Sequence, residues 1–167
     1  NATTTTTIKT WRFGYGFCIT GPTTVPTYEF PPGSGAPSPG GRFLDELDGR
    51  LSNAVYRGSS LVTSHAVVSP TDGRTRVRWY EFNAPWTAPI SFVQSGEVKE
   101  TSEANVHYFM PSISMSAPGD IAMVMSKSGS AGPVADIVRT AWSQWDPLGT
   151  MGAPEVLKSS GGPTYGT

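Results

Sequence analysis

The feature that most constrains this chain is a short strand-like pattern that occurs twice. In residues 112–116 apolar and polar side chains alternate, which is typical of a half-buried β-strand. The turn-forming stretch 117–120 separates this segment from the apolar run 121–125. Residues 54–57 lead through a Gly-Ser turn into residues 61–68 in the same order. The pattern predicts two β-hairpins.

The two hairpins align at an offset of about 60 residues. This offset places Val55 on Met115 and Leu61 on Ile121. We expect the hairpin turns near Gly58-Ser59 and near Pro118-Gly119, because these residue types favour tight turns.

A third strand-like segment follows each hairpin. Residues 77–82 are β-branched and aromatic, residues 137–142 occupy the corresponding place after the second hairpin, and residues 8–13 resemble the first of these closely. Each of the three is followed by a second extended stretch, at residues 24–30, 90–98 and 154–158. The pattern therefore indicates a four-stranded unit repeated about every 60 residues.

A repeated four-stranded unit is typical of the blades of a β-propeller. We predict an all-β fold, a partial propeller of about two and a half four-stranded blades in one unit, residues 1–167. Residues 1–30 would end one blade, 42–98 would form a complete blade and 106–160 a further one, and Pro- and Gly-rich residues 31–41 would be a loop. A β-sandwich with coincidentally similar strands is the alternative.

Incomplete propellers leave strand edges unpaired, and propellers protect their edges by closing. We therefore expect the open edges to pair with the remaining blades or with another protein chain. Expressed alone, the chain is expected to associate or to be unstable.

Composition limits the partners. Five Trp, six Tyr and seven Phe among 167 residues argue against disorder despite 19 Gly and 15 Pro. The net charge is −1, and the short row of Arg74, Arg76 and Arg78 is expected to form a solvated strand face. Nucleic-acid binding is therefore not expected. No apolar run reaches the roughly 18 residues that span a bilayer.

Few residues offer metal, redox or nucleotide chemistry. Cys18 is the single cysteine and suggests a partner elsewhere, a free thiol or a small buried hydrophobe. His65 and His107, placed by the pattern in a strand and just before one, have no metal-ligand partner at useful spacing. Residues 14–17 lack the strand and helix that flank a nucleotide-binding loop. No cofactor and no metal site is expected.

Several short segments resemble one group of proteins. The segment DGRLSNAV (48–55) and residues 60–67, 77–81, 110–115, 119–122 and 146–151 resemble secreted bacterial and environmental proteins with sialidase-like β-propellers. The likeness covers residues 42–158 and implies a propeller fold and an extracellular location. Most of that group has no assigned activity. The turn after Ser116 keeps the glycine of the sialidase Asp box but lacks its Thr-Trp, which weakens any transfer of sialidase chemistry.

A sialidase-like site would need a Tyr nucleophile, an acid and an arginine cluster. The residue types that could supply them are Arg50, Arg57 and Arg139 for the cluster, Asp48, Glu81 and Asp120 as acids, and Tyr56 or Tyr80 as nucleophile. Nothing in their spacing selects them, and Asp residues in turns are usually structural. No residue of this chain is expected to act as a catalytic nucleophile.

A Ser-His-Asp triad from Ser64, His65 and Asp72 is also not expected. Neighbouring residues in a strand point to opposite faces, and no Gly-x-Ser-x-Gly elbow is present. His65 is predicted to be a hydrogen-bonded core histidine.

Two functions stay open. The first is an extracellular propeller module with a non-enzymatic binding, adhesion or assembly role, with carbohydrate as one possible ligand. The second is a carbohydrate-active enzyme, a sialidase-like glycoside hydrolase, whose site is completed by residues outside this chain.

Overall fold

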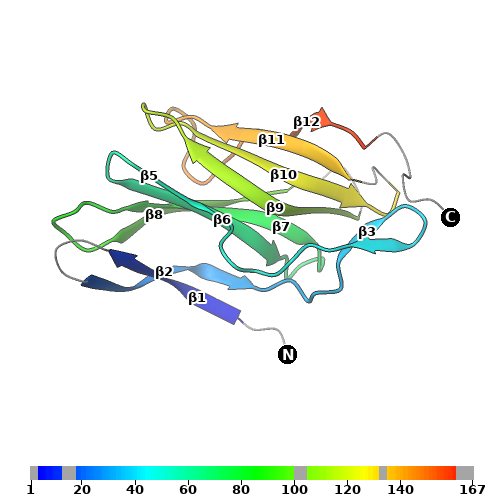
Figure 1. Ribbon diagram of the computed structural model, residues 1–167, viewed down its shortest axis with the longest axis horizontal. Coiled ribbons are helices and arrows are strands. Elements are labelled where there is room, and N and C mark those ends of the chain that lie inside the picture. Colours follow the sequence, from blue (N-terminus) through cyan, green and yellow to red (C-terminus); the bar gives the residue numbers. More distant parts are fainter. Residues whose placement is uncertain (1–3, 13–17, 100–104, 132–134, 161–167) are drawn as a thin grey trace.

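The protein is built from β-strands. The computed structural model describes residues 4–12, 18–99, 105–131 and 135–160, and these residues form strands and turns without a helix (Figure 1). The all-β prediction is confirmed. The strands are β1 (Thr4–Arg12), β2 (Cys18–Glu29), β3 (Ala36–Ser38), β4 (Arg42–Leu44), β5 (Ala54–Arg57), β6 (Ser60–Val68), β7 (Thr75–Asn83), β8 (Ser91–Val98), β9 (Val106–Met115), β10 (Ile121–Gly129), β11 (Asp136–Trp142) and β12 (Glu155–Lys158).

The strands lie in three stacked layers (Figure 1). The first layer is the antiparallel pair β1–β2, the second is the meander β5–β6–β7–β8, and the third is the meander β9–β10–β11–β12. One bridge, between Glu29 and Val68, joins the first two layers edge to edge. The short hairpin β3–β4 lies beside one end of the third layer, where Ser128 Oγ donates to the Pro37 carbonyl at 2.8 Å.

Apolar side chains fill both gaps between the layers. Between the first and second layers, Ile8 and Val25 pack with Tyr80 and Phe82. The larger core lies between the second and third layers, and its members include Val62, Val77, Trp79, Ile113, Ile121, Met123, Val138 and Trp142. The second layer is therefore buried on both faces, which explains why β6 is a nearly continuous buried strand.

The third layer is buried on one face only. In β11 buried and exposed residues alternate along the whole strand, as the period of a strand requires when one face is covered. Val138, Thr140 and Trp142 face the second layer, whereas Ile137 and Arg139 face away from it.

Both predicted hairpin turns are observed. Gly58 and Ser59 join β5 to β6 with positive φ angles of 56° and 69°, the backbone that a two-residue turn of this hand requires. The second turn spans residues 116–120, where the Ser116 N–H donates to the Asp120 carbonyl at 2.8 Å.

The alignment of Val55 with Met115 was wrong by one residue. Val55 pairs with Val62, whereas Met115 pairs with Ile121, the equivalent of Leu61. The cause is the length of the connection, because four residues separate Tyr56 from its partner Leu61, whereas five separate Met115 from its partner Ile121.

Beyond the turn, the offset of 60 holds across the strand pairs. Leu61 pairs with Phe82, and Ile121 pairs with Trp142. At the far side of the sheets, Val77 pairs with Val98 and Ile137 with Lys158. The second and third layers are therefore built to one plan.

Three further expectations were wrong. The row of arginines is not solvated, because Arg76 and Arg78 pair with Glu97 and Arg78 also donates to the carbonyls of Pro26 and Thr27 in the first layer. Residues 31–41 are not all loop, because they contain β3. His107 lies inside β9 rather than before a strand.

Candidate functional site

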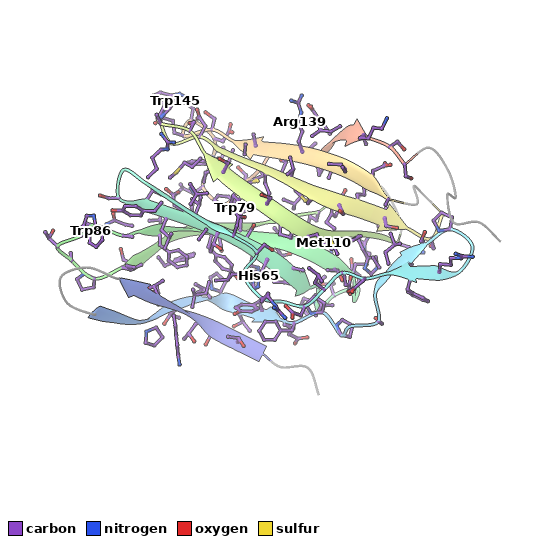
Figure 2. All side chains as sticks on the ribbon, viewed as in Figure 1. His65, Trp79, Trp86, Met110, Arg139 and Trp145 are labelled. Carbon is purple, nitrogen blue, oxygen red and sulfur yellow. The ribbon has the colours of Figure 1, made fainter. Side chains whose placement is uncertain are left out.

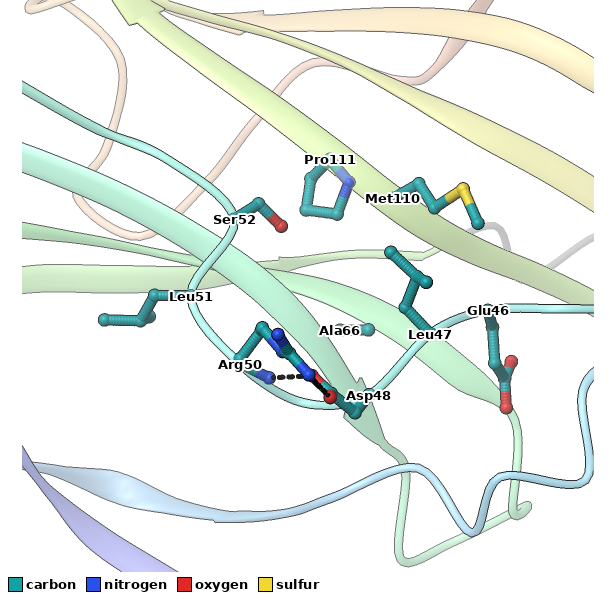
Figure 3. Close-up of a pocket in the computed structure, with 9 residues that line it drawn as sticks. All are labelled: Glu46, Leu47, Asp48, Arg50, Leu51, Ser52, Ala66, Met110 and Pro111. Carbon is teal, nitrogen blue, oxygen red and sulfur yellow. Dashed lines mark hydrogen bonds and ion pairs between the residues drawn. The ribbon is translucent and has the colours of Figure 1, made fainter.

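A hollow in the described residues lies between the segment that precedes β5 and the middle of β9 (Figure 3). Its volume is about 290 Å³. The lining residues are Glu46, Leu47, Asp48, Arg50, Leu51, Ser52, Ala66, Met110 and Pro111. Exposed aliphatic side chains make most of this surface, and an ion pair lies at its edge.

Two residues of the hollow have a left-handed backbone. Leu47 and Met110 have φ angles of 60° and 50°, which cost a non-glycine residue about 1–2 kcal/mol each. Met110 and Pro111 form a bulge, since the pairing of β9 with β10 passes from Ser112–Val124 to Phe109–Ser126. A bulge tolerates a proline because it interrupts the ladder that proline cannot complete. The bulge turns Met110 outward toward the hollow (Figure 3).

The ion pair at the edge joins Asp48 and Arg50. The Arg50 guanidinium donates to both carboxylate oxygens, with an Nη2–Oδ2 distance of 2.5 Å, and the Arg50 backbone N–H donates to Oδ1 at 2.9 Å. The hydrogen bonds from the Arg50 side chain and backbone lower the pKa of Asp48 to about 2. Asp48 is therefore ionised at neutral pH and paired with Arg50, so it is unsuited to donate a proton as an acid.

The candidate arginines do not converge. Arg50 is held by Asp48, Arg57 is exposed at the end of β5, and Arg139 donates to Glu155 from the outer face of the third layer at 2.9 Å. No two of these three arginines line the same hollow among those observed, so the described residues do not form a carboxylate clamp.

The other candidate carboxylates have structural partners. Glu81 accepts hydrogen bonds of 2.6 Å from Ser60 Oγ and from Gln94 Nε2. Asp120 closes the β9–β10 turn, where its backbone N–H donates to Ser116 Oγ at 3.0 Å, and its carboxylate accepts from the Gln144 backbone N–H at 3.3 Å. Partial burial raises the pKa of Asp72, but hydrogen bonds from neighbouring side chains, first among them Arg74, outweigh it and hold that pKa well below its usual range. The turn role expected for these aspartates is observed.

Neither tyrosine has the surroundings of a nucleophile. Tyr80 is fully buried, and burial raises the pKa of its hydroxyl. Tyr56 is half exposed on β5, and its hydroxyl makes no hydrogen bond to any carboxylate among the described residues.

His65 is the buried core histidine that was predicted. Its Nδ1 lies 2.6 Å from the Gly49 carbonyl, which can only accept, so Nδ1 carries the proton and Nε2 accepts from the Tyr80 hydroxyl at 3.0 Å. The ring also meets Tyr28 edge to face at 4.6 Å. Burial lowers the pKa of His65 to about 4, so the ring is neutral at pH 7. Ser64 lies on the opposite face, and the three residues Ser64, His65 and Asp72 make no triad.

His107 contacts a backbone N–H and lies near a buried carboxylate. Its Nδ1 accepts a hydrogen bond from the Thr75 backbone N–H at 3.2 Å, and the buried carboxylate of Glu46 lies 3.9 Å from the same nitrogen. Within the described residues, no group of three or more His, Cys, Asp and Glu could hold a metal ion. Those residues also contain no helix that is long and apolar enough to cross a membrane.

Some sequence candidates lie outside the described part of the chain. These are residues 14–17 and the side chain of Cys18. In the described part, two exposed tryptophans, Trp86 and Trp145, are surface features that the sequence analysis missed. The signal was present, because both follow the third strand of their four-stranded unit.

Comparisons with protein families, with curated proteins and with solved structures found no match to this chain. The description of the site therefore depends on its geometry alone.

Proposed function

We propose that this chain is part of an extracellular β-propeller module with a binding, adhesion or assembly role, in which a further β-sheet covers the outer face of β10–β12. In this account each of the three layers is a blade, and the protein acts through its surfaces rather than through catalysis. The extracellular location rests on the sialidase-like segments between residues 42 and 158.

One observation carries the proposal. The second and third layers share one plan at an offset of 60 residues, yet only the second is covered on both faces. At the positions equivalent to Ser64 and Val77, the third layer presents Val124 and Ile137, which are 41% and 49% exposed. Exposed apolar positions on a repeated sheet face favour a further sheet as the occupant.

The placement of the hollow fits the same account. In a propeller, the first strand of each blade lines the central channel, and β5 and β9 are the first strands of their layers. The hollow beside β9 would then open toward the channel, where propellers bind ligands. The aliphatic lining of Leu47, Leu51 and Met110 suits a ligand with an apolar surface.

The glycosidase alternative gains no support from the described residues. It would need a tyrosine hydroxyl near a carboxylate and arginines facing the same cleft. Tyr80 is buried against His65, and Arg50 and Arg139 are paired in separate places.

Sedimentation velocity tests the proposal with two arginine substitutions. Ile137→Arg places a charge on the outer face of the third layer, and Thr7→Arg places the same charge on the exposed face of β1. We expect the unmodified chain to sediment as an oligomer, Ile137→Arg to shift it toward the monomer and Thr7→Arg to leave it unchanged. A monodisperse chain that unfolds cooperatively as a monomer would overturn the proposal and favour a complete sandwich.

A further inference from the structure

Two exposed tryptophans stand at equivalent places in the second and third layers. Trp86 lies three residues beyond the end of β7, and Trp145 lies three residues beyond the end of β11. Their side chains are 66% and 87% exposed. Both lie at the end of the molecule opposite β3, where the hairpin turns are also found (Figure 2). The second and third layers thus each present one exposed indole, and both indoles lie at the same end of the molecule.

Each tryptophan loop is fixed to the hairpin turn of its own layer. In the second layer the Ala84 N–H donates to the Ser59 carbonyl at 2.7 Å. In the third layer the Gln144 N–H, at the position 60 residues further on, donates to Asp120 Oδ1 at 3.3 Å. These equivalent anchors hold both loops against the ends of the strands.

The loop of Trp145 is also closed on itself. The Ser143 N–H donates to Asp146 Oδ2 at 2.8 Å, and the Asp146 N–H donates to the Ser143 carbonyl at 2.8 Å. Below this turn, Trp142 Nε1 donates to the Pro147 carbonyl at 3.1 Å. The turn therefore presents an exposed indole on an ordered backbone, so little conformational entropy is lost when a ligand binds.

The surroundings of the two indoles select a class of ligand. Residues 84–90 carry no charged side chain, and residues 143–154 carry only Asp146, which is engaged in the turn. Anionic lipid and nucleic acid both require Lys or Arg, and neither loop supplies one. Polar side chains that can donate and accept are the sequence neighbours of the two tryptophans, Thr87 after Trp86 and Gln144 before Trp145. An indole has an apolar face and a polar edge, so it suits a ligand that combines the two.

We propose that Trp86 and Trp145 are stacking contacts for an uncharged polysaccharide. The C–H face of a sugar ring would lie on each indole, and the sugar hydroxyls would meet the neighbouring polar groups. A polymer can touch successive layers at once, which adds avidity to individually weak contacts. This inference rests on the proposed binding role and names its ligand class, but it uses the loop end of the molecule and not the outer face of β10–β12.

Affinity gel electrophoresis tests the inference, with gels containing xylan, glucomannan, hydroxyethyl cellulose or laminarin. The variants are Trp86→Ala, Trp145→Ala and their double, with Phe43→Ala as the matched control because Phe43 is an exposed aromatic residue on β4 at the other end. We expect at least one polysaccharide to retard the protein, each single variant to bind about tenfold more weakly and the double variant to migrate freely. Trp145→Tyr, which keeps an aromatic face, should restore most of the retardation.

Three results would overturn the inference. The first is that none of the four polysaccharides retards the protein. The second is that Phe43→Ala loses as much polysaccharide binding as the tryptophan variants. The third is that the tryptophans are needed for binding to phosphatidylcholine vesicles and not for binding to a polysaccharide. The double variant should sediment like the unmodified chain. If no gel retards the protein but sedimentation still shows association through the outer face, only the ligand class is rejected. Loss of that association would be detected by sedimentation and not by the gels.

Discussion

The second and third layers have one plan and two environments. Trp79 pairs with Ser64 in the second layer, and Arg139 pairs with Val124 at the same place in the third. Trp79 is fully buried and lies 6.2 Å from the ring of Trp142, whereas Arg139 is exposed and pairs with Glu155. The comparison teaches that position within the repeat determines strand pairing, while the neighbouring layer determines which faces are buried.

The largest expected difference between the layers is at these two equivalent positions. Trp79→Ala should lower the free energy of unfolding by about 3–5 kcal/mol, because it leaves a cavity between two sheets. Arg139→Ala should cost no more than about 1 kcal/mol, since exposed ion pairs contribute little. Urea unfolding of both variants measures the difference. Similar losses would mean that the two positions are equally buried in the native protein, which would contradict the comparison.

The next effect distinguishes the two interlayer cores by pH. His65 lies between the first and second layers, whereas its equivalent in the third layer is the apolar Met125. The folded-state pKa of His65 is about 4, below the usual 6.5. Between pH 6.5 and pH 4 the unfolded chain therefore binds a proton at His65 that the folded chain does not bind. The free energy of unfolding should keep its full value above pH 6.5 and should fall by roughly 3 kcal/mol as the pH falls to 4.

A set of urea titrations between pH 7 and pH 4 checks this dependence. His65→Gln should be less stable at pH 7 but nearly independent of pH in that window. The lowered pKa values of Asp48 and Asp72 begin to affect stability only below about pH 5, and they do so equally in His65→Gln and the unmodified protein, so the comparison of the two isolates His65. An equal slope in the variant and the unmodified protein would show that His65 is not the titrating group.

A smaller effect is expected where the second layer touches the loop of the third. A Cβ on Gly96 would lie 2.1 Å from the Gly149 carbonyl oxygen and 2.8 Å from Trp79 Nε1, so Gly96→Ala should cost about 1–3 kcal/mol. Gly152→Ala is the matched control, since its nearest neighbour would be the Ala141 carbonyl at 3.5 Å. Thermal unfolding should separate the two variants by several degrees. Equal stability would show that β8 and this loop are farther apart than described.

Much of the fold could be predicted from local patterns in the sequence. The alternation in residues 112–116, the turn residues Gly58 and Gly119 and the repeat offset of 60 all predict features that the structure contains. These features depend on neighbours in the sequence, which is why they could be inferred. The partial burial of Arg78 could not, because it depends on β2, where the carbonyls of Pro26 and Thr27, 52 and 51 residues away in the sequence, accept hydrogen bonds from Arg78.

The candidate site was less accessible to sequence reasoning. The hollow beside β9 depends on a bulge at Met110 and on a left-handed Leu47, and neither residue type signals that backbone. The fixed display of Trp145 depends on hydrogen bonds from Gln144 and Asp146 that only the folded loop brings together.

Hydroxyl-radical footprinting of the protein at concentrations where it associates tests the central claim most directly. The account predicts that Val124 and Ile137 are protected well beyond their exposure in the single chain, while Phe43 and Trp145, 65% and 87% exposed, stay fully reactive. Modification of Val124 and Ile137 in proportion to their exposure would mean that nothing covers the outer face of β10–β12. That result would contradict the account.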